Sequence, residues 1–562
     1  MPQELTKTDR VRRVLDNNRW ILNTESYYLS LFIALTALEL NKNPNDVIDS
    51  ELLAGQLKMV LLRLISYNQN AQKLFLFSKD WMEQFTFEEI MNLIIDTSPL
   101  SFTNRLESAE ASYSVLPIVD ELVKTKKPNR CLDICSGIGN TMIRMAMNGA
   151  SEVHGVEINH SSADMSYLRL YALQKTVDSF NFMVTSADAF QFSEHNREQK
   201  YDFIFSEFPW GISTEADSPM AKWQDKKHIF PKVSRNSEWK FIALANEHLS
   251  YNGIACLLAP ESITFKQADE EIRSYFIEHG YIEQIISLPE KLLDYTGISA
   301  LLLILSKGNK TVRFFDAKSI YITEGRRRYL PEKEIQRFFS KTDPNLVVKT
   351  THDVTQENKL NPSFHVVSSY TEGLQLQNLA QIIRARMIKK ADLDMLLSEE
   401  VTNIEFIRPK HLNDGIVSAS EFLKAKPANG TVLQNDDVLI SRVGSKIDCA
   451  VYVAHPEIVS IADENLYVVR CDITKLNPNY LLAYLQSELG RKHLAANYEG
   501  STISRISLES LKKLSIPTSS IEEQNVIGSE MKDYLRYIQK LQIELETLQE
   551  KIDDQLNEWF KG

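Results

Sequence analysis

The chain has 562 residues, more than one hydrophobic core usually supports, so we expect several domains. Hydrophobic residues make up 43% and charged residues 25%, as in an ordinary globular protein, and no apolar run is long enough to span a membrane. The five cysteines are scattered, which argues against a disulfide framework, and the N-terminus lacks the pattern of a signal peptide. We therefore expect a cytoplasmic protein with no membrane partner. The net charge of −12 neither indicates nor excludes a nucleic-acid partner.

Residues 1–100 are predicted to form a helical N-terminal domain. Apolar residues recur there at steps of three and four, as in Leu29, Phe32, Leu35 and Leu38, and in Leu57, Val60, Leu61 and Ile65. Glycine is scarce and no alternating pattern indicates a strand. No residue in this part points to catalysis.

Residues 101–345 show a different pattern, in which short apolar runs alternate with helical stretches. Runs such as CLDIC, EVHGVEI, YDFIFS and GIACLLA are typical of strands that are buried on both faces of a sheet. This alternation predicts an α/β fold, with a mostly parallel sheet and helices on both of its faces.

The first predicted strand ends in the segment LDICSGIGN, where Asp133 begins a turn and Gly137 and Gly139 follow. Glycine has no Cβ atom, so the backbone at these positions can pass close to a ligand. A dinucleotide fold would have a third glycine where Met142 stands. The spacing D-x-x-x-G-x-G is instead typical of a methyltransferase, with the glycines beside the methionine part of S-adenosyl-L-methionine. Such turns are common in α/β folds, so this one alone is a weak signal.

Carboxylates also end the next two predicted strands. Glu157 lies about 20 residues after the glycines, where a carboxylate can accept hydrogen bonds from both ribose hydroxyls. Asp188 follows the third strand and is placed to accept a hydrogen bond from the adenine amino group. Either acid alone would more often be a solvated strand end. Three consecutive strands that end in this order favour the binding of S-adenosyl-L-methionine.

The fourth predicted strand is followed by Glu207, Phe208, Pro209 and Trp210. In DNA enzymes that methylate amines, this position carries Asn or Asp, then Pro-Pro, then an aromatic residue. A side-chain oxygen and a backbone carbonyl accept hydrogen bonds from the target amine, and the aromatic ring stacks on the flipped base. Pro209 and Trp210 fit this pattern, whereas Glu207 is one methylene too long and Phe208 replaces the first proline. A displacement of roughly 1 Å can cost about 100-fold in rate.

From residue 113 to about residue 330, the sequence resembles the modification subunits of type I restriction-modification systems, which are adenine-N6 methyltransferases. The segments FIALANEHLSYNG (241–253), EIRSYFI (271–277), ISLPE (286–290) and TGISALLLILSK (296–307) follow that family's order and spacing. The resemblance implies a Rossmann-like class I methyltransferase sheet and no metal. It also implies a cofactor site formed by Gly137, Gly139, Glu157 and Asp188, and a base pocket formed by Glu207, Pro209 and Trp210. We add Asp133 to the expected cofactor site, and Phe208, whose carbonyl would accept from the amine, to the expected base pocket.

Residues 346–397 are predicted to form a helical linker, with a polar helix from about residue 370, and residues 398–525 a second domain with short strands. The segments LQNDDVLISRVG (433–444), EGSTISRISL (499–508) and LSIP (514–517) resemble one half of a type I specificity subunit. The resemblance implies an α+β target recognition domain that reads double-stranded DNA. Its candidates for phosphate or base contact are Arg442, Lys446, Arg470 and Arg505.

Residues 526–562 are predicted to form a coiled-coil helix. Met531, Tyr534, Ile538, Leu541, Leu545, Leu548 and Ile552 recur at steps of three and four. Specificity subunits usually carry two recognition domains, whereas this chain carries one. Two copies joined through the C-terminal helix would restore a two-domain reader, so we expect a homodimer. The alternative is a helix that packs on its own chain.

The leading hypothesis is a sequence-specific DNA adenine-N6 methyltransferase of a restriction-modification or related defence system, for which the family implies a separate restriction subunit. The alternative is a DNA-binding protein of a defence complex that keeps the fold without catalysis, as the departures at Glu207 and Phe208 suggest. Methylation of RNA or protein is a third hypothesis, which the resemblance to a recognition domain disfavours. The motif G-x-x-x-x-G-K-[ST] is absent, so the sequence indicates no DNA translocation.

Overall fold

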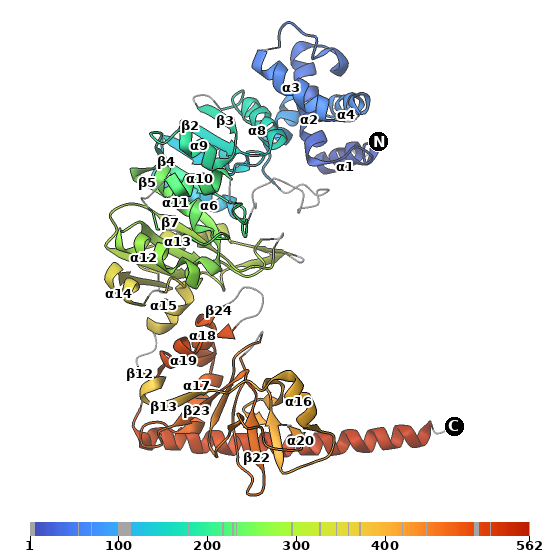
Figure 1. Cartoon of the computed structure of the whole chain (residues 1–562). Coiled ribbons are helices and arrows are strands. Elements are labelled where there is room, and N and C mark those ends of the chain that lie inside the picture. The colour runs from blue at the N-terminus through green and yellow to red at the C-terminus, as the bar shows by residue number, and fades with distance from the viewer. Residues whose placement is uncertain are drawn as a thin grey trace. The chain divides into compact units, whose positions relative to one another are not determined.

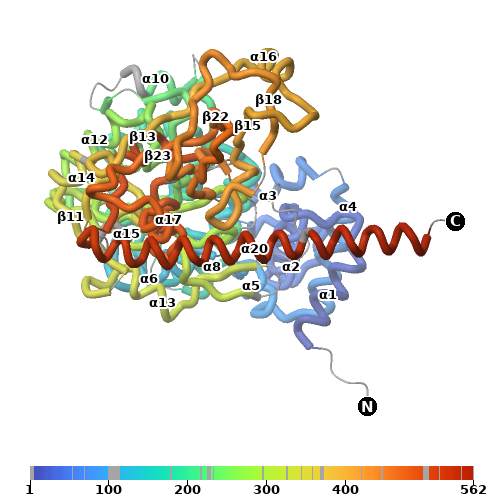
Figure 2. Tube along the Cα trace, turned by 90° about the horizontal axis from the view of Figure 1, so that it is seen from below, coloured from blue at the N-terminus to red at the C-terminus, as the bar shows by residue number. Residues whose placement is uncertain are grey.

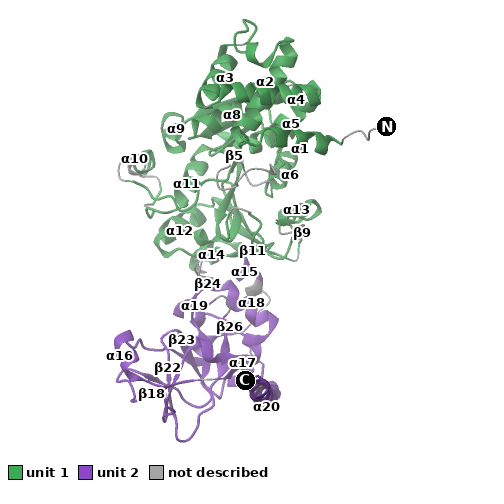
Figure 3. Ribbon diagram, turned by 90° about the vertical axis from the view of Figure 1, so that its right-hand side faces the viewer, with its two compact units in different colours: residues 1–362 green, residues 363–562 purple. Residues whose placement is uncertain are grey.

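The computed structural model describes residues 6–560, apart from residues 54, 69, 99–113, 178–179, 216–217, 227–229, 232, 294–295, 325–326, 344, 358, 370–372, 419, 445–446, 500–504 and 518. The chain forms two compact units, Met1–Pro362 and Ser363–Gly562 (Figure 3). None of the helices in the described ranges is long and apolar enough to cross a membrane.

Helices form the N-terminal part of the first unit, as predicted. They are α1 (Lys7–Asn17), α2 (Thr24–Leu40), α3 (Gly55–Tyr67), α4 (Ala71–Gln84) and α5 (Phe87–Ile95). Helix α2 is buried from Ser26 to Ala37, so it forms the centre of this bundle. Capping boxes at Asn23 and Thr86 satisfy backbone N–H groups at the starts of α2 and α5. The apolar core of the bundle includes Met165 and Leu168 of α8, so the bundle packs directly on the α/β part.

A nine-stranded mixed sheet forms the centre of the first unit (Figure 1), with the order β11-β8-β6-β7-β5-β4-β1-β2-β3. The strands are β1 (Arg130–Asp133), β2 (Glu152–Glu157), β3 (Asn181–Ser186), β4 (Tyr201–Ser206), β5 (Leu249–Pro260), β6 (Ile282–Ser287), β7 (Ala300–Leu305), β8 (Thr311–Asp316) and β11 (Leu346–Thr350). Strands β3, β2, β1, β4 and β5 are parallel, whereas β7 is antiparallel to both of its neighbours. This arrangement confirms the Rossmann-like sheet that the sequence predicts.

Helices cover both faces of this sheet. They are α6 (Leu116–Lys126), α7 (Asn140–Met147), α8 (His160–Leu173), α9 (Ala189–His195), α11 (Trp239–His248), α12 (Glu270–Glu278) and α13 (Glu332–Phe339). Alternate strand residues enter two separate apolar cores: Ile204 packs with residues of α9, α11 and α12, and Phe203 packs with residues of α6, α7 and α13. A strand buried on both sides is therefore apolar at successive positions, which explains the apolar runs of the sequence.

The predicted helical linker at residues 346–397 is corrected by the structure. Strand β11 joins the edge of the large sheet, antiparallel to β8, and two short helices follow, α14 (Thr351–Glu357) and α15 (Pro362–Ser369). Within the described part of 370–397, Ala380–Arg384 forms strand β13, and the α-helical segment is α16 (Lys390–Leu396). Strand β13 pairs with β23 (Leu466–Cys471), and this long-range pairing outweighs the helix propensity of the charged stretch.

The second unit has the α+β architecture that the sequence predicts. One sheet has the order β13-β23-β20-β21, and another has the order β14-β18-β15-β22-β19. The remaining strands of these sheets are β14 (Leu397–Ser398), β15 (Ile404–Ile407), β18 (Glu421–Leu423), β19 (Thr431–Val432), β20 (Val438–Ser441), β21 (Cys449–Val451) and β22 (Val459–Ala462). Helices α17 (Pro478–Gln486), α18 (Glu488–Ala496) and α19 (Leu508–Lys512) follow, and α17 packs on the first sheet.

The C-terminal helix α20 (Ile521–Trp559) has 39 residues and runs without a break (Figure 2). It begins with a capping box between Ser520 and Glu523. Its first half packs against α17 and the core of the second unit through Met531, Leu535 and Ile538. The first half of the helix therefore packs on its own chain, as in the alternative expectation, whereas the apolar residues of its second half, such as Leu545 and Ile552, are exposed.

Candidate active site

The predicted cofactor and base residues lie at one edge of the large sheet. Strands β4, β1, β2 and β3 are parallel and adjacent in that order, so their carboxyl ends meet at the same edge. Each strand end carries a carboxylate: Glu207 after β4, Asp133 at the end of β1, Glu157 at the end of β2 and Asp188 after β3. The structure therefore brings four acidic residues, which are distant in the sequence, into one row.

Asp133 is buried, and its two oxygens are bound inside the turn that follows β1. The backbone N–H of Cys135 donates to Oδ1 at 3.1 Å, and the hydroxyl of Thr141 donates to Oδ2. Burial is the main cause that raises the pKa of Asp133 to about 7; the charges of Glu157 and Glu207 act in the same direction, while the two hydrogen bonds oppose the shift. The acid of the base pocket is therefore close enough to the cofactor turn to act on it electrostatically.

The shifted pKa of Asp133 predicts a pH-dependent stability of the ligand-free protein. The pKa in the folded state lies above the ordinary value of 3.8, so the folded form binds this proton more tightly than the unfolded form. Stability from this group is complete below about pH 4 and is lost as the pH rises to about 7. Asp133→Asn removes this titration. As the pH rises from about 4 to about 7, the Tm of the wild type should therefore fall relative to the Tm of the variant. A difference that stays constant from about pH 4 to about pH 8 would contradict the assignment.

The turn between β1 and α7 (residues 134–139, the glycine turn) requires glycine at two positions. Gly137 and Gly139 have φ values of 53° and 85°, in the left-handed region that other residues rarely adopt. A Cβ atom at Gly139 would lie 2.5 Å from Oγ of Ser166 on α8. Gly139 is therefore also required by the close packing of α8 on the turn, which sequence reasoning did not anticipate.

Backbone N–H groups orient the carboxylates of Glu157 and Asp188. The N–H groups of Gly137 and Asn159 each donate to one oxygen of Glu157, both at 2.8 Å. Asp188 caps the N-terminus of α9, and its Oδ1 accepts from two N–H groups of the first turn at 2.8 Å and 3.1 Å. Its Oδ2 has no partner among the residues that the structure describes. Both carboxylates are thus fixed in direction and retain acceptor capacity for a ligand.

The same edge fits the parts of S-adenosyl-L-methionine. The hydroxyl of Ser136 is buried without a hydrogen-bond partner in the described ranges, which is an unmet polar group beside the glycine turn. Ile158, directly after Glu157, is 66% exposed and presents an apolar surface next to a carboxylate suited to a ribose. Sequence reasoning missed both residues. The only local signal for Ile158 is its place beyond a strand end, where an apolar side chain has no sheet neighbour to cover it.

In the base-pocket segment, the side chain of Phe208 is buried, whereas Glu207 is half-buried and Pro209 is exposed. The ring of Phe208 stacks on Phe241 of α11, with centroids 5.0 Å apart and an angle of 3° between the planes. The pattern of the DNA enzymes has a proline ring at this position, which restricts the backbone. Here the packing of the Phe208 ring on α11 holds the same residue in place.

Trp210 is half-buried between the two apolar cores. Its indole N–H donates to the carbonyl of Leu258 on β5 at 3.3 Å, so one end of the ring is tethered to the sheet. The segment that the sequence assigns to the base pocket is thus held at both Phe208 and Trp210.

Two charged residues at the start of α11 hold the loop that follows Trp210, and sequence reasoning missed both. Glu238 accepts a hydrogen bond from the N–H of Gly211 at 3.1 Å, and Gly211 has a φ of 70°. The ammonium of Lys240, 1% exposed, donates to the carbonyl of Arg235 at 2.7 Å and to the hydroxyl of Thr214. Burial lowers the pKa of Lys240. The two ends of the 211–235 loop are therefore joined by buried polar contacts.

The loop also reaches the helix that Asp188 caps. It contains α10 (Pro219–Lys226), whose Trp223 is buried against α9. The indole N–H of Trp223 donates to the hydroxyl of Ser193 at 3.2 Å, and its ring lies 5.4 Å from that of Phe190. The described part of this loop thus contacts, through Trp223, the helix that Asp188 caps.

In the second unit, Arg470 forms a bidentate ion pair with Asp437. Its Nε and Nη2 donate to the two carboxylate oxygens, both at 2.9 Å, and the side chain of Asp437 is completely buried. Two of the five guanidinium donors of Arg470 are therefore committed to the fold. The arginine neutralises a buried acid that directly precedes the neighbouring strand β20, which is a structural contribution that the sequence did not reveal.

The other predicted DNA contacts have different environments. Arg442 donates to the carbonyl of Glu464 at 2.6 Å, and its guanidinium lies 5.4 Å from the ring centroid of Tyr467. Arg505 is exposed and has no side-chain partner among the described residues. Lys446 lies outside the described residues.

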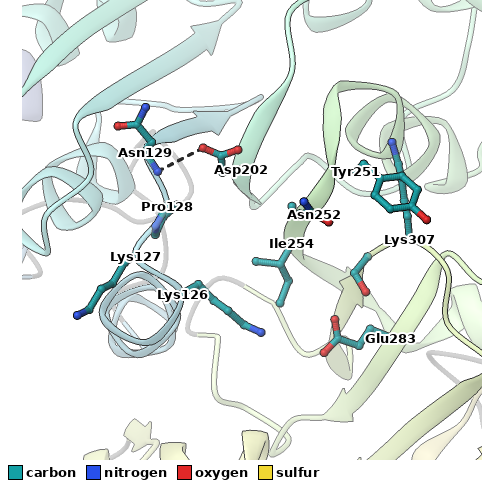
Figure 4. Close-up of a pocket in the computed structure, with 12 residues that line it drawn as sticks. Lys126, Lys127, Pro128, Asn129, Asp202, Tyr251, Asn252, Ile254, Glu283 and Lys307 are labelled. Carbon is teal, nitrogen blue, oxygen red and sulfur yellow. Dashed lines mark hydrogen bonds between the residues drawn. The ribbon is translucent and has the colours of Figure 1, made fainter.

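A cavity of about 530 Å³ opens at the amino ends of the strands, on the opposite edge of the large sheet (Figure 4). Its lining includes Lys126, Asp202, Glu283 and Lys307, of both charge signs. Asp202 accepts a hydrogen bond from the N–H of Asn129 at 3.3 Å, and Lys307 donates to a backbone carbonyl. This cavity is separate from the row of strand-end carboxylates. Within the described ranges, no group of three or more His, Cys, Asp or Glu residues could hold a metal ion.

Comparison with known proteins gives two family matches. Residues 84–361 match the model of the N-6 DNA Methylase family, and residues 371–549 match that of the Type I restriction modification DNA specificity domain. A curated relative, the type I restriction enzyme MpnII methylase subunit of Mycoplasma pneumoniae, is 22% identical over 200 residues. That match covers 33% of this chain and 36% of the relative, so it spans about a third of the relative's length.

Two solved structures resemble the chain at 13% identity. The type I restriction-modification methyltransferase subunit from Streptococcus thermophilus has a TM-score of 0.47, with coverage of 62% of this chain and 96% of that chain. The type IIG restriction endonuclease BpuSI also has a TM-score of 0.47, with coverage of 93% of this chain and 74% of that chain. Because both likenesses are distant, the fold described above rests on the strand order of this chain itself.

Proposed function

Because the chain belongs to the N-6 DNA methylase family and carries a type I DNA specificity domain, we propose that it is a sequence-specific DNA adenine-N6 methyltransferase. Its methyl donor is S-adenosyl-L-methionine, which when bound supplies a methyl group on a positively charged sulfur. The row of strand-end carboxylates at the edge of the large sheet is the observation that carries the proposal, because it combines a cofactor site and an acceptor for an amine in one place.

The cofactor is held by the first three strand ends. Glu157, oriented by two backbone N–H groups, accepts hydrogen bonds from the ribose hydroxyls, and Ile158 packs on the adenine ring. The unpartnered Oδ2 of Asp188 accepts from the adenine amine. Asp133 holds the glycine turn, and Gly137 and Gly139 give that turn the shape that admits the methionine part. Ser136 is a candidate for an additional polar contact.

The target adenine is held by the segment after β4. The carboxylate of Glu207 and the carbonyl of Phe208 accept hydrogen bonds from the exocyclic amine, which directs its lone pair toward the methyl group. Trp210 stacks on the flipped base, and Pro209 lines the pocket. The stacking of Phe208 on Phe241 supports this role, because it fixes the residue whose carbonyl must point at the amine.

The second unit reads double-stranded DNA. Arg505, exposed and without a partner in the described ranges, is the first candidate for phosphate or base contact, followed by Arg442 and Lys446. The ion pair of Arg470 with Asp437 favours a supporting role for that arginine. By the family's organisation, the protein acts in a restriction-modification or related defence system and can associate with a separate restriction subunit.

The second half of α20 supports pairing with a second copy of the chain. Its apolar residues are between 41% and 68% exposed: Leu541, Leu545, Leu548, Ile552, Leu556 and Trp559. They follow each other at steps of three and four, which is the pattern of a coiled-coil surface. A homodimer through this surface would bring two recognition domains together for a split target site.

A charge placed on this surface should dissociate the homodimer. Leu548→Glu puts a carboxylate into the apolar contact, so the molar mass from light scattering should fall from about two chains to one. Gln549→Glu adds the same charge on the neighbouring, exposed position and should leave the mass unchanged. A wild-type protein that is monomeric at micromolar concentration, or a Leu548→Glu variant that remains a dimer, would contradict the pairing.

Methyl transfer distinguishes the proposed enzyme from a DNA-binding relative without catalysis. The purified chain is incubated with methyl-labelled S-adenosyl-L-methionine and duplex DNA of mixed sequence, and label in adenine is measured after digestion to nucleosides. We expect the label to appear in N6-methyladenine. Binding of the cofactor and of DNA without any labelled adenine would instead support the non-catalytic alternative.

A further inference from the structure

Arg169 occupies a position that the cofactor and base roles do not explain. It lies on α8, a helix that lies between the helical bundle and the large sheet in Figure 1, and it is one of the largest fully buried side chains among the described residues. A buried arginine is uncommon, because removing a guanidinium from water is costly unless its charge and its donors are satisfied. Its surroundings therefore indicate what the residue does.

The guanidinium joins two parts of the first unit through four hydrogen bonds. On one side, Nε donates to the carbonyl of Ile94 at 2.9 Å and Nη2 donates to the carbonyl of Asp96 at 2.8 Å. On the other side, Nη1 donates to the carbonyl of Ile138 at 2.9 Å and to the side-chain oxygen of Asn140 at 2.6 Å. The first pair of acceptors lies at the C-terminal end of α5, and the second lies in the glycine turn and at the start of α7.

The positive charge of Arg169 is balanced by dipoles and by an aromatic ring. No carboxylate among the described residues forms an ion pair with it. The carbonyls of Ile94 and Asp96 belong to the C-terminal end of α5, where the helix dipole is negative and carbonyls lack helical partners. The guanidinium carbon also lies 4.4 Å from the ring centroid of Tyr28 on α2. The helical bundle thus supplies most of the environment that keeps this cation buried.

We infer that Arg169 is a positioning residue for cofactor binding: it fixes the glycine turn against the end of α5, so that the helical bundle sets the shape of the cofactor site. The fork of the guanidinium suits this function, because it presents donors to both sides at once in one plane. Ile138 and Asn140 lie directly beside Gly137 and Gly139, so any movement of the guanidinium moves the turn. The inference rests on the proposed use of S-adenosyl-L-methionine.

Removal of the Asn140 acceptor tests this inference without deleting the buried cation. Asn140→Ala leaves three of the four hydrogen bonds of Arg169 in place, so the protein should fold. The dissociation constant for S-adenosyl-L-methionine, measured by calorimetry on the full chain, should rise about tenfold. Hydrogen exchange of the ligand-free protein should become faster in residues 134–141. Asn140→Asp keeps an oxygen that can accept from Arg169 and should restore most of the affinity.

A second variant and a matched control separate positioning from general stability. Arg169→Lys keeps the charge but cannot span both sets of acceptors, so it should weaken cofactor binding by at least as much as Asn140→Ala. Asn18 is also a buried asparagine, and its side chain donates to Val14 and Asp80 inside the helical bundle. Asn18→Ala should lower the Tm without changing the dissociation constant.

The possible outcomes are distinct. If Asn140→Ala and Arg169→Lys bind the cofactor as tightly as the wild type, or if Asn18→Ala weakens binding equally, the inference is overturned. Failure of the wild-type protein to bind S-adenosyl-L-methionine would instead refute the proposed function. Even if the wild type does not bind the cofactor, faster hydrogen exchange in residues 134–141 of the ligand-free Asn140→Ala variant would report on the hydrogen bond between Arg169 and Asn140.

Discussion

Replacement of Glu207 with alanine should reduce adenine methylation by at least about 100-fold. We propose this carboxylate as the side-chain acceptor for the target amine, and no other described strand end of the row is assigned to the base. The dissociation constant for S-adenosyl-L-methionine should change little, because the proposed cofactor contacts lie on Glu157, on Asp188 and in the glycine turn. N6-methyladenine released from treated DNA is measured by mass spectrometry, and cofactor binding is measured separately by calorimetry.

Two further variants make this result specific. Glu207→Asp keeps an acceptor oxygen at the position where related enzymes carry Asn or Asp, so it should retain measurable activity. Glu215 is an exposed acid in the following loop, and Glu215→Ala should methylate at the wild-type rate. Wild-type methylation by Glu207→Ala would show that another group accepts the amine and that the base pocket has been assigned to the wrong residue.

Loss of Arg470 should destabilise the second unit by about 3 kcal/mol, because its removal leaves the carboxylate of Asp437 buried without its ion-pair partner. Arg470→Ala should therefore shift the unfolding transition of this unit to lower denaturant concentration. Arg505→Ala should leave that transition unchanged, since the side chain of Arg505 is exposed. It should instead weaken DNA binding and lower its salt dependence, as expected for a lost phosphate contact.

These two arginines form a matched pair, since both were candidates for DNA contact from the sequence. A double variant that replaces both Arg470 and Asp437 with apolar residues should regain much of the stability lost in Arg470→Ala. If Arg470→Ala unfolds at the wild-type denaturant concentration and loses DNA binding, then the ion pair is dispensable and Arg470 contacts DNA.

The row of strand-end carboxylates was predictable because its signals are local. Each of the acids at positions 133, 157, 188 and 207 stands at the end of an apolar run, and parallel strands that end in sequence must meet at one edge. The burial of Phe208 against Phe241 was not predictable, because the two residues are 33 positions apart and belong to different elements. The stacking of Phe208 on Phe241, which holds Phe208 where the pattern has a proline, is a contact that only the folded chain reveals.

The features that escaped prediction depend on partners that are distant in the sequence. Arg169 bonds to Ile94, 75 residues away, and to Ile138, 31 residues away, so its own neighbourhood shows only an arginine in a helix. Residues 380–384 were expected to be helical because the surrounding stretch is polar and charged. They form a strand because β23 offers a complementary edge more than 80 residues later in the chain, and the local pattern carries no trace of that edge.

We propose that this chain methylates adenine at N6 in a DNA sequence that it reads itself. Methylation-aware sequencing of DNA from cells that express the chain tests it most directly, with cells expressing Glu207→Ala as the comparison. We expect N6-methyladenine at one short recurring sequence in the first culture and its absence from the second. DNA without methylated adenine in both cultures, while the purified wild-type protein binds S-adenosyl-L-methionine and duplex DNA, would contradict the claim.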